Sequence, residues 1–167
     1  MDLKRLFKNE CNTAINACKK YKNMFCKDKF KVLKLLNDGE IKSETDYFIY
    51  VNRDKFMTYV YKKNNNKWNI VQSYICSIGK PSTPTPRASY KVKLKGEYFG
   101  EKHGYKCLYY TQIEKNYLFH SIIYNLNGTV RDGRLGKAIS DGCIRLATPN
   151  AKWIWDNVPK DTCILIE

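Results

Sequence analysis

Residues 47–61 read YFIYVNRDKFMTYVY, and this stretch decides the fold class because it contains two short runs of aromatic and β-branched residues. Such residues are enriched in β-strands. The polar run at 62–67 predicts a hairpin tip before a third run of the same kind at 68–76. The sequence therefore predicts a β-rich domain that begins near residue 45.

The segment after residue 76 also has the sequence signals of strands and turns. Three prolines between positions 81 and 86 predict a fixed, extended loop, because proline cannot donate a ladder hydrogen bond in a central strand. Turn signals stand at Asn127-Gly128 and Asp132-Gly133, and Pro149 is suited to the first turn of a short helix that ends near Asn157. Further strands are expected at 89–94, 106–112, 117–124 and 163–166.

Residues 3–38, before the β-rich part, have a helical pattern. Apolar residues recur there at intervals of three and four positions. We expect Asp28 to cap a second helix that carries Phe30, Leu33 and Leu36, with Gly39 as its stop signal. The expected organisation is thus a helical N-terminal extension at 1–44, followed by a β-rich domain at 45–167.

Composition limits the classes of function. The chain has 167 residues and is 43% hydrophobic, which is enough for a real core and excludes a disordered chain. Its 30 Lys and Arg against 16 Asp and Glu give a net charge of +14, which favours polyanionic surroundings. Because the charge is diffuse, arginines are few and no nucleic-acid-binding motif is present, no specific nucleic-acid partner is expected.

The seven cysteines, at positions 11, 18, 26, 76, 107, 143 and 163, contain no CxxC pair. A zinc ribbon or a thioredoxin-like motif is therefore excluded, and neither a metal nor a cofactor is expected. No run of about eighteen apolar residues is present, so we expect no transmembrane helix. The first twenty residues also lack the apolar segment of a secretory signal.

Cys143 is the strongest candidate nucleophile. It lies in the stretch AISDGCIRL at 138–146, and the chain has only two histidines, His103 and His120, that could serve it as a base. Gly142 would leave the neighbouring backbone N–H groups free to face an oxyanion, and Arg145 could favour the thiolate or bind a carboxylate. On composition alone, a buried structural cysteine is the favoured interpretation.

The chain resembles the L,D-transpeptidase catalytic domain of bacterial cell-wall enzymes. That family has a His followed later by Ser/Thr-His-Gly-Cys, an apolar residue and Arg or Asn. Here Phe119-His120-Ser121 matches the first part, and SDGCIR at 140–145 matches the second. The segments Ser77-Ile78-Gly79, TPTP at 83–86, Ile49-Tyr50-Val51 and the last strand also resemble family segments, so the resemblance covers about 46–167.

The resemblance implies a mainly β, sandwich-like domain with a short C-terminal helix. It also implies that Cys143 attacks a peptidoglycan stem peptide at the carbonyl that joins an L-centre to a terminal D-residue. His120 would be the base, and the Ser121 carbonyl would orient its ring. The expected oxyanion and substrate-binding residues are Ser140, Asp141, Gly142, Arg145 and Tyr110.

Two positions depart from the family pattern. Asp141 stands where the family usually has a histidine, and a carboxylate beside Gly142 would tend to raise the pKa of the Cys143 thiol. Ser121 replaces the commoner glycine. The separation of His120 and Cys143, 23 positions with two turn signals, predicts a hairpin insertion that borders the cleft.

The expected function is crosslinking of stem peptides through a thioester at Cys143. The alternatives are an L,D-carboxypeptidase acting on the same stems and a non-catalytic wall-binding module with the same fold. The expected partners are peptidoglycan stem peptides and anionic wall polymers, and we expect a monomer. Because the substrate is extracytoplasmic, we expect a wall-facing protein that depends on a leader outside this sequence or on an unusual release route.

Overall fold

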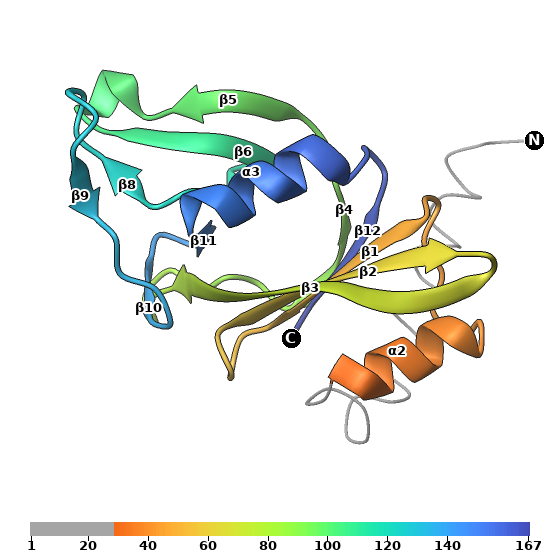
Figure 1. Ribbon diagram of the computed structural model, residues 1–167. Helices are drawn as coiled ribbons and strands as arrows, with labels where there is room; N and C mark the ends of the chain where they lie inside the picture. The colour runs from red at the N-terminus through yellow and green to blue at the C-terminus, as the bar shows by residue number, and fades with distance from the viewer. Residues whose placement is uncertain (1–28) are drawn as a thin grey trace, which may run out of the picture.

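The computed structural model describes residues 29–167, which form a 12-stranded sheet with one helix on each side of its first part (Figure 1). The helices are α2 (Lys29–Asn37) and α3 (Thr148–Asn157), with a 3-10 turn η1 (Glu101–His103). The strands are β1 (Tyr47–Asn52), β2 (Met57–Asn64), β3 (Lys67–Gly79), β4 (Ala88–Lys91), β5 (Lys95–Phe99), β6 (Lys106–Glu114), β7 (Tyr117–His120), β8 (Ile123–Tyr124), β9 (Val130–Asp132), β10 (Ala138–Ser140), β11 (Ile144–Leu146) and β12 (Cys163–Ile166).

The strand order is β4-β12-β1-β2-β3-β11-β7-β6-β8-β9, with β10 paired to β3 and β5 paired to β6. Strand β3 joins the two parts of this path. Its residues 67–75 pair with β2, whereas Cys76 and Ser77 pair with Leu146 and Arg145 of β11. The position of β11 is therefore tied directly to the β1–β2–β12 part of the sheet.

The main core lies between the two parts of the sheet and α3. It contains inward-facing residues of the central strands, such as Ile49, Val60 and Ile164, together with Ile154 of α3. Each of these four side chains is at most 1% exposed. Residues that alternate with them along β1 face the opposite side, as expected for the two-residue period of a strand.

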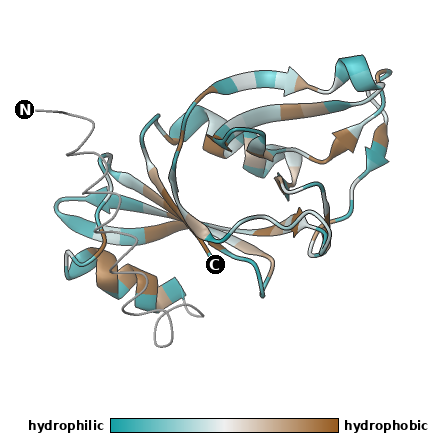
Figure 2. Ribbon diagram, turned by 180° about the vertical axis from the view of Figure 1, so that it is seen from behind, coloured by the Kyte–Doolittle hydropathy of each residue, from teal (hydrophilic) through white to brown (hydrophobic). Residues whose placement is uncertain are grey.

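Helix α2 covers that opposite side. Its Val32 and Leu36 pack with Phe48, Tyr50 and aromatic residues of β2 and β3, which explains why β1 is buried on both faces. Figure 1 shows α2 on the far side of β1–β3 from α3, and Figure 2 shows brown and teal bands alternating along it.

The ends of α2 are anchored by polar contacts. Asn37 accepts a hydrogen bond from the Trp68 N–H at 2.8 Å and donates one to the Trp68 carbonyl at 3.2 Å, which fixes the helix end against β3. Gly39 follows with φ +75°, a left-handed conformation that glycine adopts without strain, and ends the helix where the sequence predicted.

The expected fold class, mainly β with a short C-terminal helix and a helix before the sheet, is confirmed. The buried stripe of α2 differs from the prediction, because Val32, Leu35 and Leu36 are buried whereas Phe30 is 62% exposed. The predicted helices and cysteines at positions 1–28, with the Asp28 cap, lie outside the described residues.

Two predicted strands are divided in the structure. The strand expected at 89–94 ends at Lys91, and β5 begins at Lys95, because the chain leaves β12 and joins β6 there. The strand expected at 117–124 is interrupted after His120, where Ser121 bonds Leu108 instead of continuing the β7 ladder. The hairpin tip is shorter than 62–67, since β2 and β3 extend to Asn64 and from Lys67.

Among residues 29–167, no helix has the length and apolar character that crossing a membrane requires.

Candidate active site

Two neighbouring parallel strands hold the candidate site. Strand β11 pairs with β7 in a register that sets Arg145 opposite His120 and Ile144 opposite Phe119. Cys143 directly precedes β11. His120, in β7, and the cysteine just before the neighbouring strand β11 are thus brought to the same part of one sheet, although they are 23 positions apart in sequence.

The turn before Cys143 depends on Gly142. This glycine has φ +114°, and a Cβ there would lie 2.6 Å from Cε1 of the Tyr117 ring, so any side chain would meet both backbone strain and a clash. The Ser140 hydroxyl accepts a hydrogen bond from the Gly142 N–H at 3.2 Å and donates one to the Cys143 carbonyl at 2.6 Å. The Ser140 hydroxyl therefore links two backbone groups of the turn.

This arrangement corrects one expectation. The sequence suggested that the Gly142 and Cys143 N–H groups are both free to face an oxyanion, but the Gly142 N–H is directed to the Ser140 hydroxyl. Among the hydrogen bonds described for residues 29–167, none uses the Cys143 N–H as donor. The Cys143 amide is thus the better-placed oxyanion donor of the two.

The Cys143 thiol is half-buried and contacts the Asn116 carbonyl, with 3.3 Å between Sγ and the oxygen. Burial raises the pKa of this thiol, because the thiolate loses hydration. A backbone hydrogen bond from Leu118 opposes the rise, the Asp141 charge adds to it, and the Arg145 charge opposes it. At neutral pH the resting group is the thiol.

His120 is 4% exposed, and its Nδ1 lies 2.6 Å from the Ser121 carbonyl oxygen. A carbonyl can only accept, so Nδ1 carries the proton and Nε2 holds the free lone pair. Burial lowers the pKa of His120 to about 4, the carbonyl contact opposes this, and the Arg145 charge lowers it further. The ring is therefore neutral at pH 7 and able to accept a proton.

Ser121 acts through its backbone and is itself fully buried. Its hydroxyl accepts from the Leu108 N–H at 2.7 Å and donates to the Ile122 carbonyl at 2.6 Å. These two bonds hold the peptide whose carbonyl meets His120. The Ser121 carbonyl therefore contacts the His120 ring, and the orienting role that the resemblance implies for Ser121 stays a prediction.

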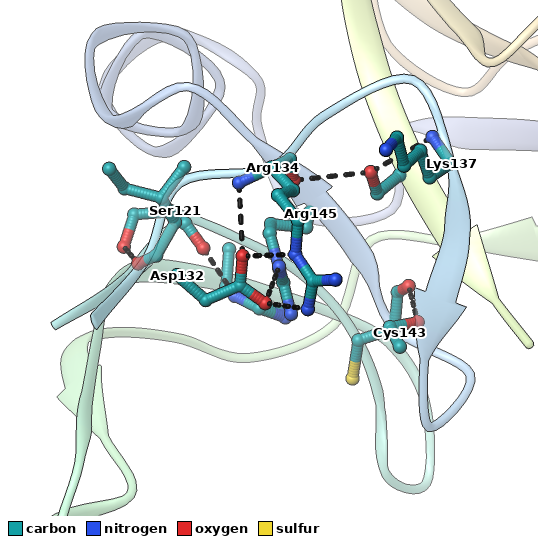
Figure 3. Close-up of polar contacts among 10 residues, drawn as sticks. Ser121, Asp132, Arg134, Lys137, Cys143 and Arg145 are labelled. Atoms are coloured by element: carbon teal, nitrogen blue, oxygen red, sulfur yellow. Dashed lines mark hydrogen bonds and ion pairs between the residues drawn. The ribbon is translucent and has the colours of Figure 1, made fainter. Parts of the chain in front are cut away.

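Arg145 lies behind the site instead of in it. Its side chain is 4% exposed, and NH1 lies 2.9 Å from Oδ2 of Asp132 (Figure 3). Asp132 also meets Arg134, with Nε and NH2 each 2.9 Å from a carboxylate oxygen. These hydrogen bonds and charges hold the pKa of Asp132 well below its usual range.

Direct binding of a substrate carboxylate by Arg145 therefore does not fit this arrangement, because its guanidinium is buried and paired. Asp132 was not among the residues that the sequence singled out. It belongs to the insertion between His120 and Cys143, where the sequence signals were the turns at Asn127-Gly128 and Asp132-Gly133. The structure shows that this insertion, through Asp132, is attached to β11.

Asp141 lies on the rim of the turn, with its side chain 83% exposed. Its Oδ1 is 2.5 Å from Nζ of Lys80, which belongs to the loop after β3. The expectation that Asp141 projects near the active-site turn and not into the core agrees with this position. The ion pair with Lys80 sets a cation beside the Asp141 carboxylate.

Tyr110 belongs to an aromatic cluster beside His120. Its ring contacts Phe99, with 5.8 Å between centroids, and a Cβ on Gly96 would lie 2.3 Å from the Tyr110 ring. Phe99 in turn packs edge-on against the His120 ring at 5.3 Å. Tyr110 is thus joined to the imidazole through Phe99. His103 stacks on Tyr105 in the exposed turn η1.

Within the described part of the chain, no three His, Cys, Asp or Glu side chains come together as a set that could hold a metal ion.

Residues 46–166 match the YkuD family, described as the L,D-transpeptidase catalytic domain. A Bacillus subtilis (strain 168) protein named as an L,D-transpeptidase, YciB, is 31% identical over 108 residues, which are 59% of this chain and 56% of that protein. A crystal structure from Clostridium acetobutylicum ATCC 824 is described as a fused Zn-dependent amidase/peptidase/peptidoglycan-binding domain-containing protein. It is 38% identical, with a TM-score of 0.68, over 83% of this chain and 59% of that one.

An L,D-transpeptidase structure in complex with imipenem is 21% identical, with a TM-score of 0.57, over 73% of this chain and 59% of that one. At 21% sequence identity, this similarity shows a shared fold and nothing more. The chain spans little more than half the length of each of these relatives.

Proposed function

The chain belongs to the L,D-transpeptidase catalytic domain family, and from this premise we propose that it crosslinks peptidoglycan stem peptides through a thioester at Cys143. The family and the fold support a transpeptidase. The single observation that best supports the finer proposal is the 2.6 Å contact between His120 Nδ1 and the Ser121 carbonyl, which leaves Nε2 as a base beside the strand that follows Cys143.

The protonation states of Cys143 and His120 favour loss of the thiol proton during the attack on the substrate, not before it. Burial raises the pKa of the Cys143 thiol and lowers that of His120 to about 4, so a resting thiolate–imidazolium pair is disfavoured. A neutral thiol and a neutral imidazole suit general base catalysis, in which Nε2 takes the thiol proton as the C–S bond forms.

In the first half-reaction, sulfur adds to the carbonyl carbon between the L-centre of a stem and its terminal D-residue. The oxyanion that forms is stabilised by backbone N–H groups, of which the Cys143 amide is the better placed. The C–N bond then breaks, and the D-residue leaves as an amine that takes the proton from His120. The product is a thioester at Cys143.

In the second half-reaction, a side-chain amine of another stem attacks the thioester and loses a proton to Nε2 of His120, which then passes that proton to the departing sulfur. The new amide is the crosslink, and the thiol is regenerated. If water attacks instead, the product is a shortened stem, which is the carboxypeptidase alternative. Both reactions share the acyl-enzyme and differ only in the acceptor.

The test is turnover of a disaccharide-tetrapeptide stem followed by mass spectrometry. We expect the wild type to release D-alanine and to form a crosslinked dimer, and Cys143→Ala to do neither while remaining folded. Monomeric tripeptide stem as the only product would favour the carboxypeptidase. Equal product yields from the wild type and Cys143→Ala, or no product from either, would contradict the proposal; no product at all would favour the non-catalytic wall-binding alternative.

The family match at 46–166 supports a catalytic domain that begins near residue 45, after an N-terminal extension whose helix α2 packs on β1–β3. Since L,D-transpeptidases act on cell-wall peptidoglycan, we place the site of action outside the cytoplasmic membrane. The net charge of +14 suits retention by anionic wall polymers. Recovery of the full-length protein only from cytosol would count against this location.

A further inference from the structure

Thr85 lies in the proline-containing loop after β3 and is 1% exposed. Its hydroxyl makes two hydrogen bonds that span the base of the active-site turn. Thr85 Oγ1 accepts from the Gly79 N–H at 2.9 Å and lies 2.7 Å from the Gly142 carbonyl oxygen. Thr85 and Gly142 are 57 positions apart, so only the tertiary fold makes this contact.

The direction of the second bond follows from counting protons. A threonine hydroxyl has one hydrogen, and a backbone carbonyl can only accept. The hydroxyl proton is therefore committed to the Gly142 carbonyl, while the lone pairs of Oγ1 receive the Gly79 N–H. Both partners are backbone groups, so neither can rotate away as a side chain could.

This bond also sets the direction of a second group. The Gly142 carbonyl and the Cys143 N–H belong to one planar trans peptide, in which they point to opposite sides. Anchoring the carbonyl on Thr85 therefore turns the Cys143 N–H away from the proline loop. The Cys143 N–H is the group identified above as the better-placed oxyanion donor, since the Gly142 N–H is taken by Ser140.

Gly79 allows the proline-containing loop to pack closely against the end of β3. A Cβ on Gly79 would lie 2.1 Å from the Thr83 carbonyl and 2.6 Å from the Thr85 nitrogen, so only glycine permits Thr85 to reach this depth. The Lys80 N–H and the Thr83 hydroxyl both bond the Ser140 carbonyl, at 2.8 and 3.3 Å. Of these contacts, only that of Thr85 is made to the peptide that precedes the nucleophile.

We propose that Thr85 is a positioning residue that aims the Cys143 N–H at the developing oxyanion. It does not touch the substrate, and it acts through the Gly142–Cys143 peptide. This role rests on the proposed function, because it presumes acyl transfer at Cys143.

The test compares two reactions of the same thiol. Acylation by imipenem passes through an oxyanion, whereas alkylation by iodoacetamide is a displacement at a saturated carbon and forms none. Thr85→Val keeps the shape and removes the hydroxyl, Thr85→Ser keeps the hydroxyl, and Thr83→Val removes a hydroxyl from the same loop that bonds another carbonyl. Second-order rates for both reagents are measured by intact mass.

We expect imipenem to acylate Thr85→Val at least about tenfold more slowly than the wild type. This loss is smaller than the 10²–10³-fold cost of removing an oxyanion donor outright, because the Cys143 amide remains. Alkylation should stay within about twofold, Thr85→Ser should restore acylation, and Thr83→Val should acylate within about twofold of the wild type. If Thr85→Val does not fold, Thr85→Ala takes its place, since it also removes the hydroxyl without filling the site.

Acylation unchanged in Thr85→Val, or both rates lowered by the same factor, would overturn the positioning role while leaving the proposed function intact. Failure of the wild type to be acylated at Cys143 would instead refute the proposed function itself. The two failures are thus distinguishable in one experiment.

Discussion

The Asp132 carboxylate lies 2.9 Å from the buried guanidinium of Arg145, which joins the insertion between His120 and Cys143 to the strand that follows the nucleophile. Arg145 is 4% exposed, and its Nε has no hydrogen-bond partner within residues 29–167. Its charge is therefore compensated mainly by Asp132. That charge in turn adds to the lowering of the His120 pKa and opposes the rise of the Cys143 pKa.

The first prediction concerns this pair. Asp132→Ala should lower the free energy of unfolding by about 3 kcal/mol, because it leaves a buried guanidinium without its counter-ion. The matched control is Asp54→Ala, which breaks an ion pair of similar length, 3.0 Å to Arg87, whose side chains are 61% and 51% exposed. That change should cost less than about 1 kcal/mol. Urea unfolding measures both, and equal losses would contradict the prediction.

The second prediction follows from His120. Its pKa is lowered to about 4 in the folded protein, against about 6.5 for an ordinary histidine, so the unfolded chain binds a proton between these values and the folded protein does not. Stability should therefore fall as the pH decreases from about 6.5 to 4. Between pH 7 and 4.5 the contribution of this group is about 2.5 kcal/mol.

Carboxylates also titrate in this range, so the measurement is a difference between variants. The loss of unfolding free energy from pH 7 to 4.5 should be smaller in His120→Asn than in the wild type by about 2.5 kcal/mol. His103→Asn, which changes the exposed histidine of η1, should show the wild-type loss. The same pH dependence in all three proteins would rule out a buried neutral His120.

The sequence was sufficient for features that depend on local pattern. The aromatic and β-branched residues at 47–51 and the glycine after α2 correctly predicted strand β1 and the end of the helix. The divisions at Lys91 and Ser121 were missed, because the residues on both sides are good strand formers and only the change of partner strand separates them. Local pattern carries no information about which neighbour a strand pairs with.

The same limit applies to the site. Cys143, His120 and Ser121 were singled out through their ordered motifs, and the register of β7 and β11 sets His120 opposite Arg145, two positions after Cys143. The contacts Thr85–Gly142 and Asp132–Arg145 were not predicted, because each joins residues that are distant in sequence and ordinary in type. For the same reason, Arg145 was expected to face the substrate.

The third prediction tests the turn at Gly142. Gly142→Ala should lower the rate of imipenem acylation by more than about tenfold, because a Cβ would meet the Tyr117 ring at 2.6 Å and must shift the peptide before Cys143. Gly128→Ala is the matched control, since Gly128 also has a left-handed φ, +85°, but has no atom within 4 Å of a Cβ. Gly128→Ala has only the free-energy cost of placing alanine in a left-handed conformation, and it should be acylated at the wild-type rate. Equal rates in the two variants would show that the Tyr117 contact is unimportant.

The last prediction concerns the charge pair of Asp141 and Lys80 at the rim of the turn. Burial is the main reason that the pKa of Cys143 is raised, and the Asp141 charge is a smaller one. Since Asp141 is 83% exposed and lies 2.5 Å from Lys80, its repulsion of a thiolate is weakened by solvent and by the neighbouring cation. Asp141→Asn and Asp141→His should therefore lower the pKa of the Cys143 thiol only slightly and speed imipenem acylation at pH 7 by less than about threefold.

Lys80→Met should act in the opposite direction, because it removes the compensating charge and leaves the carboxylate. The pH dependence of the iodoacetamide alkylation rate measures the thiol pKa in each variant. A rise of that pKa in Asp141→Asn would mean that the carboxylate holds the turn through hydrogen bonds and does not act by repulsion.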